Sequence, residues 1–130
     1  MGFFKRLFGI CNTPLPGDVG CWSYSNNKIT IDMKRAPELT LKGSALRLEG
    51  RSLPQRFLVV HGNDGKFHAF VNKCAHAGRR IDPVADEEKL MCCSLGKSTY
   101  DYSGKNESGS AKGPIQALPV EQKEDKLIIG

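Results

Sequence analysis

The chain has 130 residues, of which 39% are hydrophobic and 25% are charged, and it carries a formal net charge of +5. This length and composition predict one compact soluble domain. The longest apolar runs are far shorter than the roughly 18 residues that a membrane-spanning helix needs. Five cysteines and three histidines are the unusual part of the composition. Because an odd cysteine count argues against a pure disulfide framework, it favours a metal or redox site.

The excess positive charge lies in the first half of the chain. Residues 1–56 carry nine Lys and Arg against four Asp and Glu, whereas residues 57–130 carry ten of each kind. The basic residues are scattered, and Trp22 is the only tryptophan. A nucleic-acid-binding surface would instead need a basic stripe with interleaved aromatic residues. We therefore expect no nucleic acid among the partners.

The N-terminal segment is amphipathic. Within residues 2–10, four apolar side chains stand at helical spacing opposite two basic ones, as in an interfacial anchor. This face either docks on a membrane surface or partner, or packs on its own domain. A secretory signal is not recognisable, which predicts a cytoplasmic protein, peripheral to a membrane if the anchor is used. We expect residues 1–24 to form this stub with a Pro/Gly linker, and residues 25–130 to form the domain.

Short segments of alternating or continuous apolar residues follow, separated by Gly- or Pro-containing breaks. The strongest signal is a hairpin, in which 57–61 and 66–71 flank the turn Gly62-Asn63-Asp64-Gly65. The pattern predicts an all-β domain, a small antiparallel sandwich or barrel. Its other predicted strands are 28–34, 39–41, 45–48, 89–92, 98–101, 118–122 and 126–129.

Two cysteine-containing segments each follow a predicted strand. Cys74-Ala75-His76-Ala77-Gly78 comes after the hairpin, and Cys92-Cys93-Ser94-Leu95-Gly96 comes after strand 89–92. Fifteen residues separate His76 from Cys92. Thiolates favour iron–sulfur clusters or zinc, and imidazole suits the same metals. The two segments therefore predict a metal site between two loops.

This spacing resembles the Rieske family of iron–sulfur domains. The strand Lys66–Val71, the segment Ser98-Thr99-Tyr100-Asp101 and the pair Gly113-Pro114 are similar to further parts of that family's pattern. The resemblance covers roughly residues 25–130. It implies two cluster-binding loops on hairpin arms and a [2Fe-2S] cluster. It also implies a ferredoxin-like protein that passes single electrons to or from a partner oxidoreductase and is not itself an enzyme.

The resemblance also implies roles for single residues. Ser98 and Tyr100 match hydroxyl donors to cluster and ligand sulfurs, which raise the reduction potential. Gly78 and Gly96 match loop glycines, and Leu95 belongs to the apolar cover of the site. The implied metal ligands are Cys74, His76, Cys92 and Cys93.

The second histidine of the family pattern is missing, because Leu95 or Gly96 occupies its position. His61 and His68 lie in the hairpin strands, too far along the chain to replace it. Three interpretations remain. In the first, Cys74, His76, Cys92 and Cys93 together hold a cluster. In the second, Cys74, His76 and one of Cys92 and Cys93 hold the cluster, and water or another residue fills the fourth position. In the third, the fold holds a single metal such as zinc, or none. The alternative sources of a fourth ligand are Lys97, Cys11 and Cys21.

The third interpretation carries an alternative function. A cluster-free Rieske fold would be a binding subunit that docks on a larger oxidoreductase or a membrane. Cys11 and Cys21 could pair across the Pro/Gly-rich segment, but in a reducing compartment we expect two free thiols.

Overall fold

The computed structural model describes residues 11–75, 78–93, 97–109 and 113–130. The described residues form twelve strands and two short 3-10 helices, without any helix long and apolar enough to cross a membrane. The all-β prediction is confirmed. The elements are β1 (Trp22–Ser25), β2 (Lys28–Asp32), η1 (Met33–Arg35), η2 (Pro37–Leu39), β3 (Ala45–Leu48), β4 (Phe57–His61), β5 (Phe67–Val71), β6 (Ile81–Pro83), β7 (Lys89–Cys92), β8 (Thr99–Asp101), β9 (Asn106–Ser108), β10 (Ala117–Leu118), β11 (Val120–Lys123) and β12 (Lys126–Ile129).

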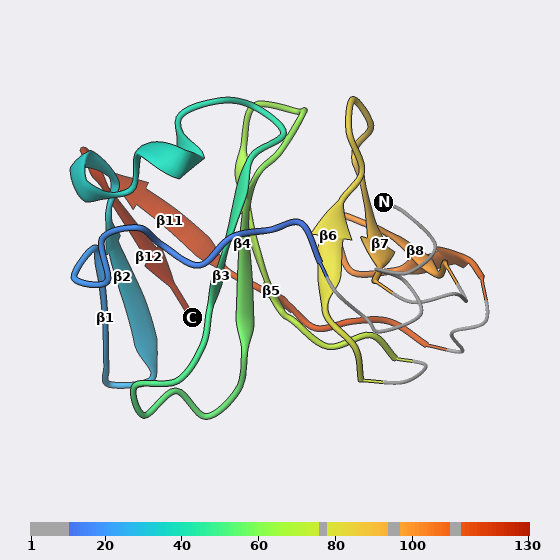
Figure 1. The fold of residues 1–130 in the computed structure, drawn as a ribbon, viewed down its shortest axis with the longest axis horizontal. Coiled ribbons are helices and arrows are strands. Elements are labelled where there is room, and N and C mark those ends of the chain that lie inside the picture. Colours follow the sequence, from blue (N-terminus) through green and yellow to red (C-terminus); the bar gives the residue numbers. More distant parts are fainter. Residues whose placement is uncertain (1–10, 76–77, 94–96, 110–112) are drawn as a thin grey trace.

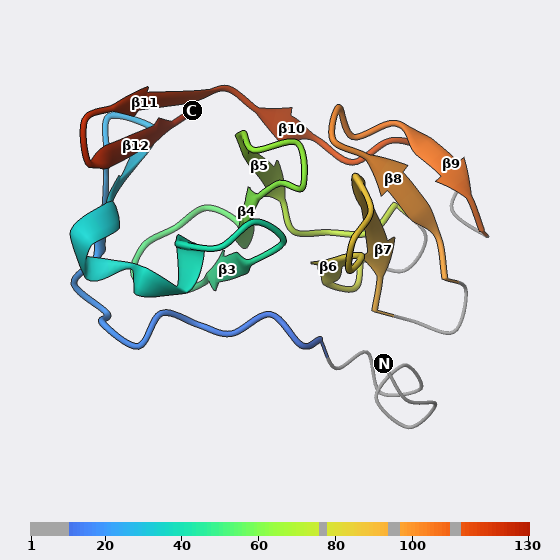
Figure 2. The same ribbon diagram turned by 90° about the horizontal axis from the view of Figure 1, so that it is seen from above.

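The strands make three antiparallel sheets of four strands each. Their orders are β1-β2-β12-β11, β10-β5-β4-β3 and β6-β7-β8-β9. The sheet that contains β3, β4 and β5 lies between the other two (Figure 1). Residues 11–20 run along one side of the molecule, from beside β6 past β3 (Figure 2).

The middle sheet is covered on both faces, which explains the continuous apolar run of β4. Along a strand, successive side chains point to opposite faces. Val59 accordingly packs with the first sheet's core, whereas Leu58 and Val60 pack with the third sheet's core. The second of these cores also contains Cys74 and Cys92. Both cysteines are therefore part of the hydrophobic interior between the middle and third sheets.

Most predicted strands are confirmed, with three corrections. The segment 118–122, expected to be one strand, is divided at Pro119 between β10 of the middle sheet and β11 of the first sheet. The strand expected at 39–41 is wrong, because Pro37, with its φ fixed by the ring, begins the 3-10 helix η2 there. Buried Leu39 ends that helix, and Leu41 is 74% exposed. The strand expected at 28–34 ends at Asp32, whose side chain accepts a hydrogen bond from Lys34 N and caps η1.

Three strands escaped prediction. β1 pairs with β2 through Asn26 and Asn27, both with positive φ, in a two-residue hairpin that a Gly-based signal overlooks. Although proline usually interrupts a strand, Asp82 and Pro83 belong to β6, because an edge strand tolerates proline. β9 is a short polar edge strand without an apolar pattern.

Leu46 on β3 is completely buried in the core between the first and middle sheets. We expect Leu46→Ala to lower the free energy of unfolding by about 2–5 kcal/mol, because it leaves a cavity there. Leu41→Ala, the same change at an exposed position, should stay within about 0.5 kcal/mol of the wild type. Urea denaturation measures both values, and equal values for the two variants would contradict this account of the core.

Candidate metal centre

The described ends of the two cysteine loops are bonded to one short stretch of backbone. The first loop joins β5 to β6, and the Cys74 N–H donates to Arg79 O at 2.7 Å. Gly78, with φ of 68°, donates its N–H to Cys74 O at 2.9 Å. In the second loop, which joins β7 to β8, the Cys93 N–H donates to Arg80 O at 2.9 Å. Residues 79 and 80 thus hold both loops together.

Two buried thiols and a buried phenol belong to one core beside these loops. Cys74 is 1% exposed, and Cys92 and Tyr100 are 0% exposed, in the same core. The Tyr100 hydroxyl lies 3.4 Å from Cys74 Sγ and accepts a hydrogen bond from Ala75 N at 3.2 Å. Burial, followed by the hydrogen bond with Cys74, raises the pKa of Tyr100 well above that of an ordinary phenol. The hydroxyl therefore stays protonated and can donate a hydrogen bond to the Cys74 sulfur.

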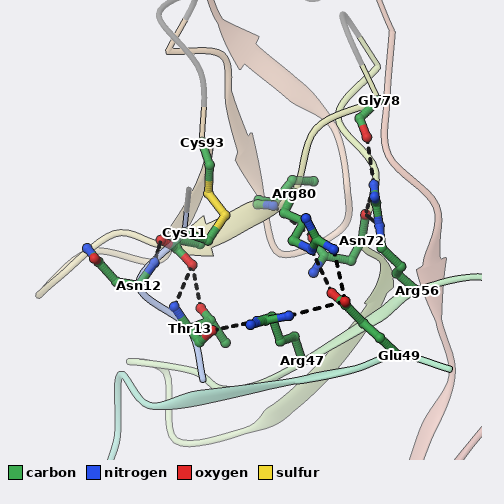
Figure 3. Close-up of a disulfide and its surroundings, with 12 residues drawn as sticks. Cys11, Asn12, Thr13, Arg47, Glu49, Arg56, Asn72, Gly78, Arg80 and Cys93 are labelled. Atoms are coloured by element: carbon green, nitrogen blue, oxygen red, sulfur yellow. Dashed lines mark hydrogen bonds and ion pairs between the residues drawn. A yellow bond between two sulfur atoms is a disulfide. The ribbon is translucent and has the colours of Figure 1, made fainter. Parts of the chain in front are cut away.

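Arg56 and Asn72 fix the first loop. The Asn72 side chain, fully buried, accepts a hydrogen bond from Ile81 N at 2.7 Å. Arg56 Nη2 donates to Asn72 O at 3.0 Å and to Gly78 O at 2.6 Å, so one guanidinium joins the start and the end of the loop (Figure 3). The sequence does not single out Arg56, because Arg56 lies 16 residues before Asn72, directly before β4, and no motif marks it.

The ion pairs of Glu49 anchor the segment that holds both loops. Arg80 donates two hydrogen bonds to Glu49, at 2.6 and 2.9 Å, and Arg47 lies 3.1 Å from the same carboxylate. The hydrogen bond from Arg80 is the main cause that lowers the pKa of Glu49, against the opposing effect of burial. Glu49 therefore stays ionised and holds Arg80, whose carbonyl accepts the Cys93 N–H.

Cys93 points away from this centre. It forms a disulfide with Cys11, with a Cα–Cα distance of 5.5 Å (Figure 3). Adjacent side chains at a strand end point in opposite directions, so Cys92 enters the core while Cys93 faces the N-terminal segment. The expectation of a free thiol at Cys11 is wrong, whereas Cys21 remains a buried thiol. In the disulfide, the Cys93 sulfur is not a thiolate.

The other predicted site residues have varied positions. Ser98 is buried, 1% exposed, and its carbonyl accepts the Cys92 N–H at 2.8 Å. His76, Leu95 and Gly96, like the amphipathic residues 2–10, lie outside the described residues. His61 Nδ1 lies 2.8 Å from Leu39 O, and His68 pairs with Asp64, which confirms both as packed strand histidines.

An open groove runs beside the first loop. It has a volume of about 410 Å³ and extends from Cys74 and Gly78 to Pro114 and Ile115. Lys73, which is exposed, and Gln116 line it as well. The buried Cys74 thus lies directly behind a surface that another molecule can reach.

Comparison with known proteins gives a family match over most of the chain. The family model described as the Rieske [2Fe-2S] domain matches residues 32–119. Among curated proteins, none is similar enough in sequence to be matched.

Several solved structures share the fold. The ferredoxin of carbazole 1,9a-dioxygenase from Nocardioides aromaticivorans has a TM-score of 0.60 and 17% identity, over 72% of this chain and 89% of that chain. A plasma membrane Rieske protein from the cyanobacterium Synechocystis has a TM-score of 0.53 and 20% identity, over 65% and 85%. A complex of reduced oxygenase and oxidized ferredoxin in carbazole 1,9a-dioxygenase contains a chain with a TM-score of 0.58 and 17% identity, over 68% and 82%.

Removing the Arg56 guanidinium should loosen the first loop. We expect Arg56→Gln to reduce the hydrogen-exchange protection of the Cys74 and Gly78 amides by about tenfold or more, since hydrogen bonds from a charged donor contribute roughly 1.5–3 kcal/mol. Arg51→Gln is the matched control, because Arg51 bonds to Val19 O and Trp22 O beside the first sheet. Equal hydrogen-exchange protection of the Cys74 and Gly78 amides in the two variants would show that Arg56 does not hold the loop.

Proposed function

Because this chain belongs to the Rieske [2Fe-2S] domain family, we propose that it is a one-electron carrier with a [2Fe-2S] cluster between its two cysteine loops. The observation that carries the proposal is the meeting of Cys74, Cys92 and Tyr100 in one buried core. Cysteine thiolates are the ligands of such clusters, and in Rieske centres imidazole replaces them on one iron.

The described residues Cys74, Cys92 and Tyr100 fit this group, whereas His76 lies outside the described residues. Cys74 and Cys92 would supply the thiolates for one iron, and His76 would supply imidazole for the other. When bound, the cluster supplies reversible one-electron chemistry. Tyr100, 3.4 Å from Cys74 Sγ, would donate a hydrogen bond that stabilises the more negative, reduced state. Ser98, buried at the end of the second loop, is the second hydroxyl that we assign to the site.

Cys93 is not a ligand in the proposed centre. Its sulfur is bonded to Cys11, on the side of the second loop that faces the N-terminal segment. The four-protein-ligand set with Cys93 would require breaking this bond and turning the side chain into the core. We therefore propose Cys74, His76 and Cys92 as the protein ligands in the disulfide-bonded form, with the fourth position filled by water or by Lys97.

The groove at the first loop is the surface that we propose for the redox partner. Cys74 lies behind it, so a partner docked there approaches the buried thiol end of the site. One similar structure is a ferredoxin of a dioxygenase, and another is a complex of an oxygenase with its ferredoxin. By analogy, we propose an oxidoreductase as the partner, with this chain delivering electrons and not catalysing the reaction itself.

Replacing either buried thiol ligand should abolish the cluster. We expect about two irons and two acid-labile sulfides per chain in the anaerobically purified protein, and their loss in Cys74→Ser and Cys92→Ser. Cys21→Ser, a matched change at a buried thiol of the other core, should keep both. Protein that takes up no iron on reconstitution would contradict the proposed electron-carrier function and favour a cluster-free docking subunit.

The Tyr100 hydroxyl should raise the reduction potential. Removing it in Tyr100→Phe should lower the potential by roughly 40–60 mV, the equivalent of one hydrogen bond for a one-electron couple. Tyr102→Phe is the control, since that hydroxyl accepts from Asn63 N instead. Film voltammetry measures both variants, and an unchanged potential in Tyr100→Phe would remove the tyrosine from the site.

A further inference from the structure

A second set of ligand atoms lies on the outer side of the second loop. Cys11 Sγ, Cys93 Sγ and a carboxylate oxygen of Asp82 all lie within 4.8 Å of one another. Cys93 and Asp82 are buried and Cys11 is half-buried. The three residues come from the N-terminal segment, the second loop and β6, so the tertiary fold brings them together.

The Asp82 carboxylate is fixed in its orientation. It is 8% exposed and accepts hydrogen bonds from Asn12 N at 2.7 Å, Thr13 N at 3.0 Å and Thr13 Oγ1 at 2.5 Å. An ionised carboxylate has about four acceptor positions. The three bonds to Asn12 and Thr13 use three of them, which leaves Asp82 able to accept one further interaction.

The N-terminal segment is also held independently of the disulfide. Arg47 Nε donates to Thr13 O at 2.9 Å (Figure 3), and Arg47 N donates to Pro14 O at 3.0 Å. Together with the Asp82 contacts, these bonds keep residues 12–14 against β3 and β6. Breaking the disulfide therefore leaves Cys11 close to Cys93 and Asp82.

Solvent reaches the Asp82 side of this set of atoms. Two cavities, of about 350 and 310 Å³, are both lined by Asn12 and Asp82. The second extends to Met91 and Cys92. An ion and its remaining water ligands can thus approach the carboxylate from outside.

We propose that Cys11, Cys93 and Asp82 form a redox-gated site for a thiophilic divalent cation, with zinc as the best match. A dithiol reductant attacks one sulfur, the S–S bond breaks, and two electrons pass to the pair while the reductant becomes a disulfide. Two protons leave the thiols when the cation binds. Zinc then takes two thiolates and one carboxylate, and water completes the tetrahedron.

The donor set selects this class of ion. Magnesium and calcium take oxygen ligands, whereas thiolates favour zinc and softer ions. The site is separate from the proposed cluster, because Cys93 faces Cys11 while Cys92 faces the core. In either form the cross-link attaches the N-terminal segment to the second loop, by a disulfide or through the metal.

The test is zinc titration of the full chain with and without a phosphine reductant, followed by competition with a chromogenic chelator. The reduced protein should bind one equivalent more than the oxidised protein. Reduced Cys11→Ser should lose that equivalent, and reduced Cys21→Ser should keep it. Because both variants retain Cys74 and Cys92, zinc held there cancels in the comparison. Asp82→Asn should weaken binding by about tenfold or more.

Equal zinc binding by reduced Cys11→Ser and Cys21→Ser would overturn the proposal, as would equal binding by the reduced and oxidised wild type. Cys11 lies outside both cores, and thermal unfolding verifies that each variant is folded. The outcome is independent of the cluster. A chain that binds this zinc but no iron would refute the proposed carrier alone, and a chain with iron but without this zinc would refute the second site alone.

Discussion

The contact between the Tyr100 hydroxyl and the Cys74 sulfur is the interaction on which the site depends. Tyr100 belongs to β8 in the third sheet, and Cys74 follows β5 in the middle sheet, so the contact joins the two sheets inside their common core. Burial keeps the phenol protonated. Its hydroxyl contacts both the Cys74 sulfur and Ala75 N. A polar contact of this kind is costly to bury unless each partner is satisfied. Inside this core, the Tyr100 hydroxyl is the polar partner of the Cys74 thiol.

The adjacent cysteines Cys92 and Cys93 divide the thiols of this chain between two environments. Opposite side-chain directions at the end of β7 send Cys92 into the core and Cys93 towards Cys11. One side of the second loop thus serves the proposed cluster, and the other attaches the N-terminal segment. The same geometry explains why three cysteines at Rieske spacing do not imply three cluster ligands.

Three strands of the middle sheet, β3, β4 and β5, are predictable from the sequence, because period-2 alternation and the Gly-flanked turn reflect a backbone geometry that is local. The resemblance to the Rieske family also pointed to Cys74, Cys92 and Tyr100, which the structure brings into one core. Sequence analysis could not find the Cys11–Cys93 pair, 82 residues apart. That bond depends on the path of the N-terminal segment across two sheets, as does the contact of Arg56 with the first loop. Neither leaves a periodic or motif-like signal in the sequence.

The most direct test of the central claim is electron–nuclear double resonance on reduced protein labelled with ¹⁵N-histidine. The account predicts coupling to one histidine, which His76→Ala removes. His61 and His68 should contribute nothing, because their rings contact Leu39 O and Asp64. Absence of any histidine coupling in an iron-containing protein, or coupling that persists in His76→Ala, would contradict a Rieske-type centre between the two cysteine loops.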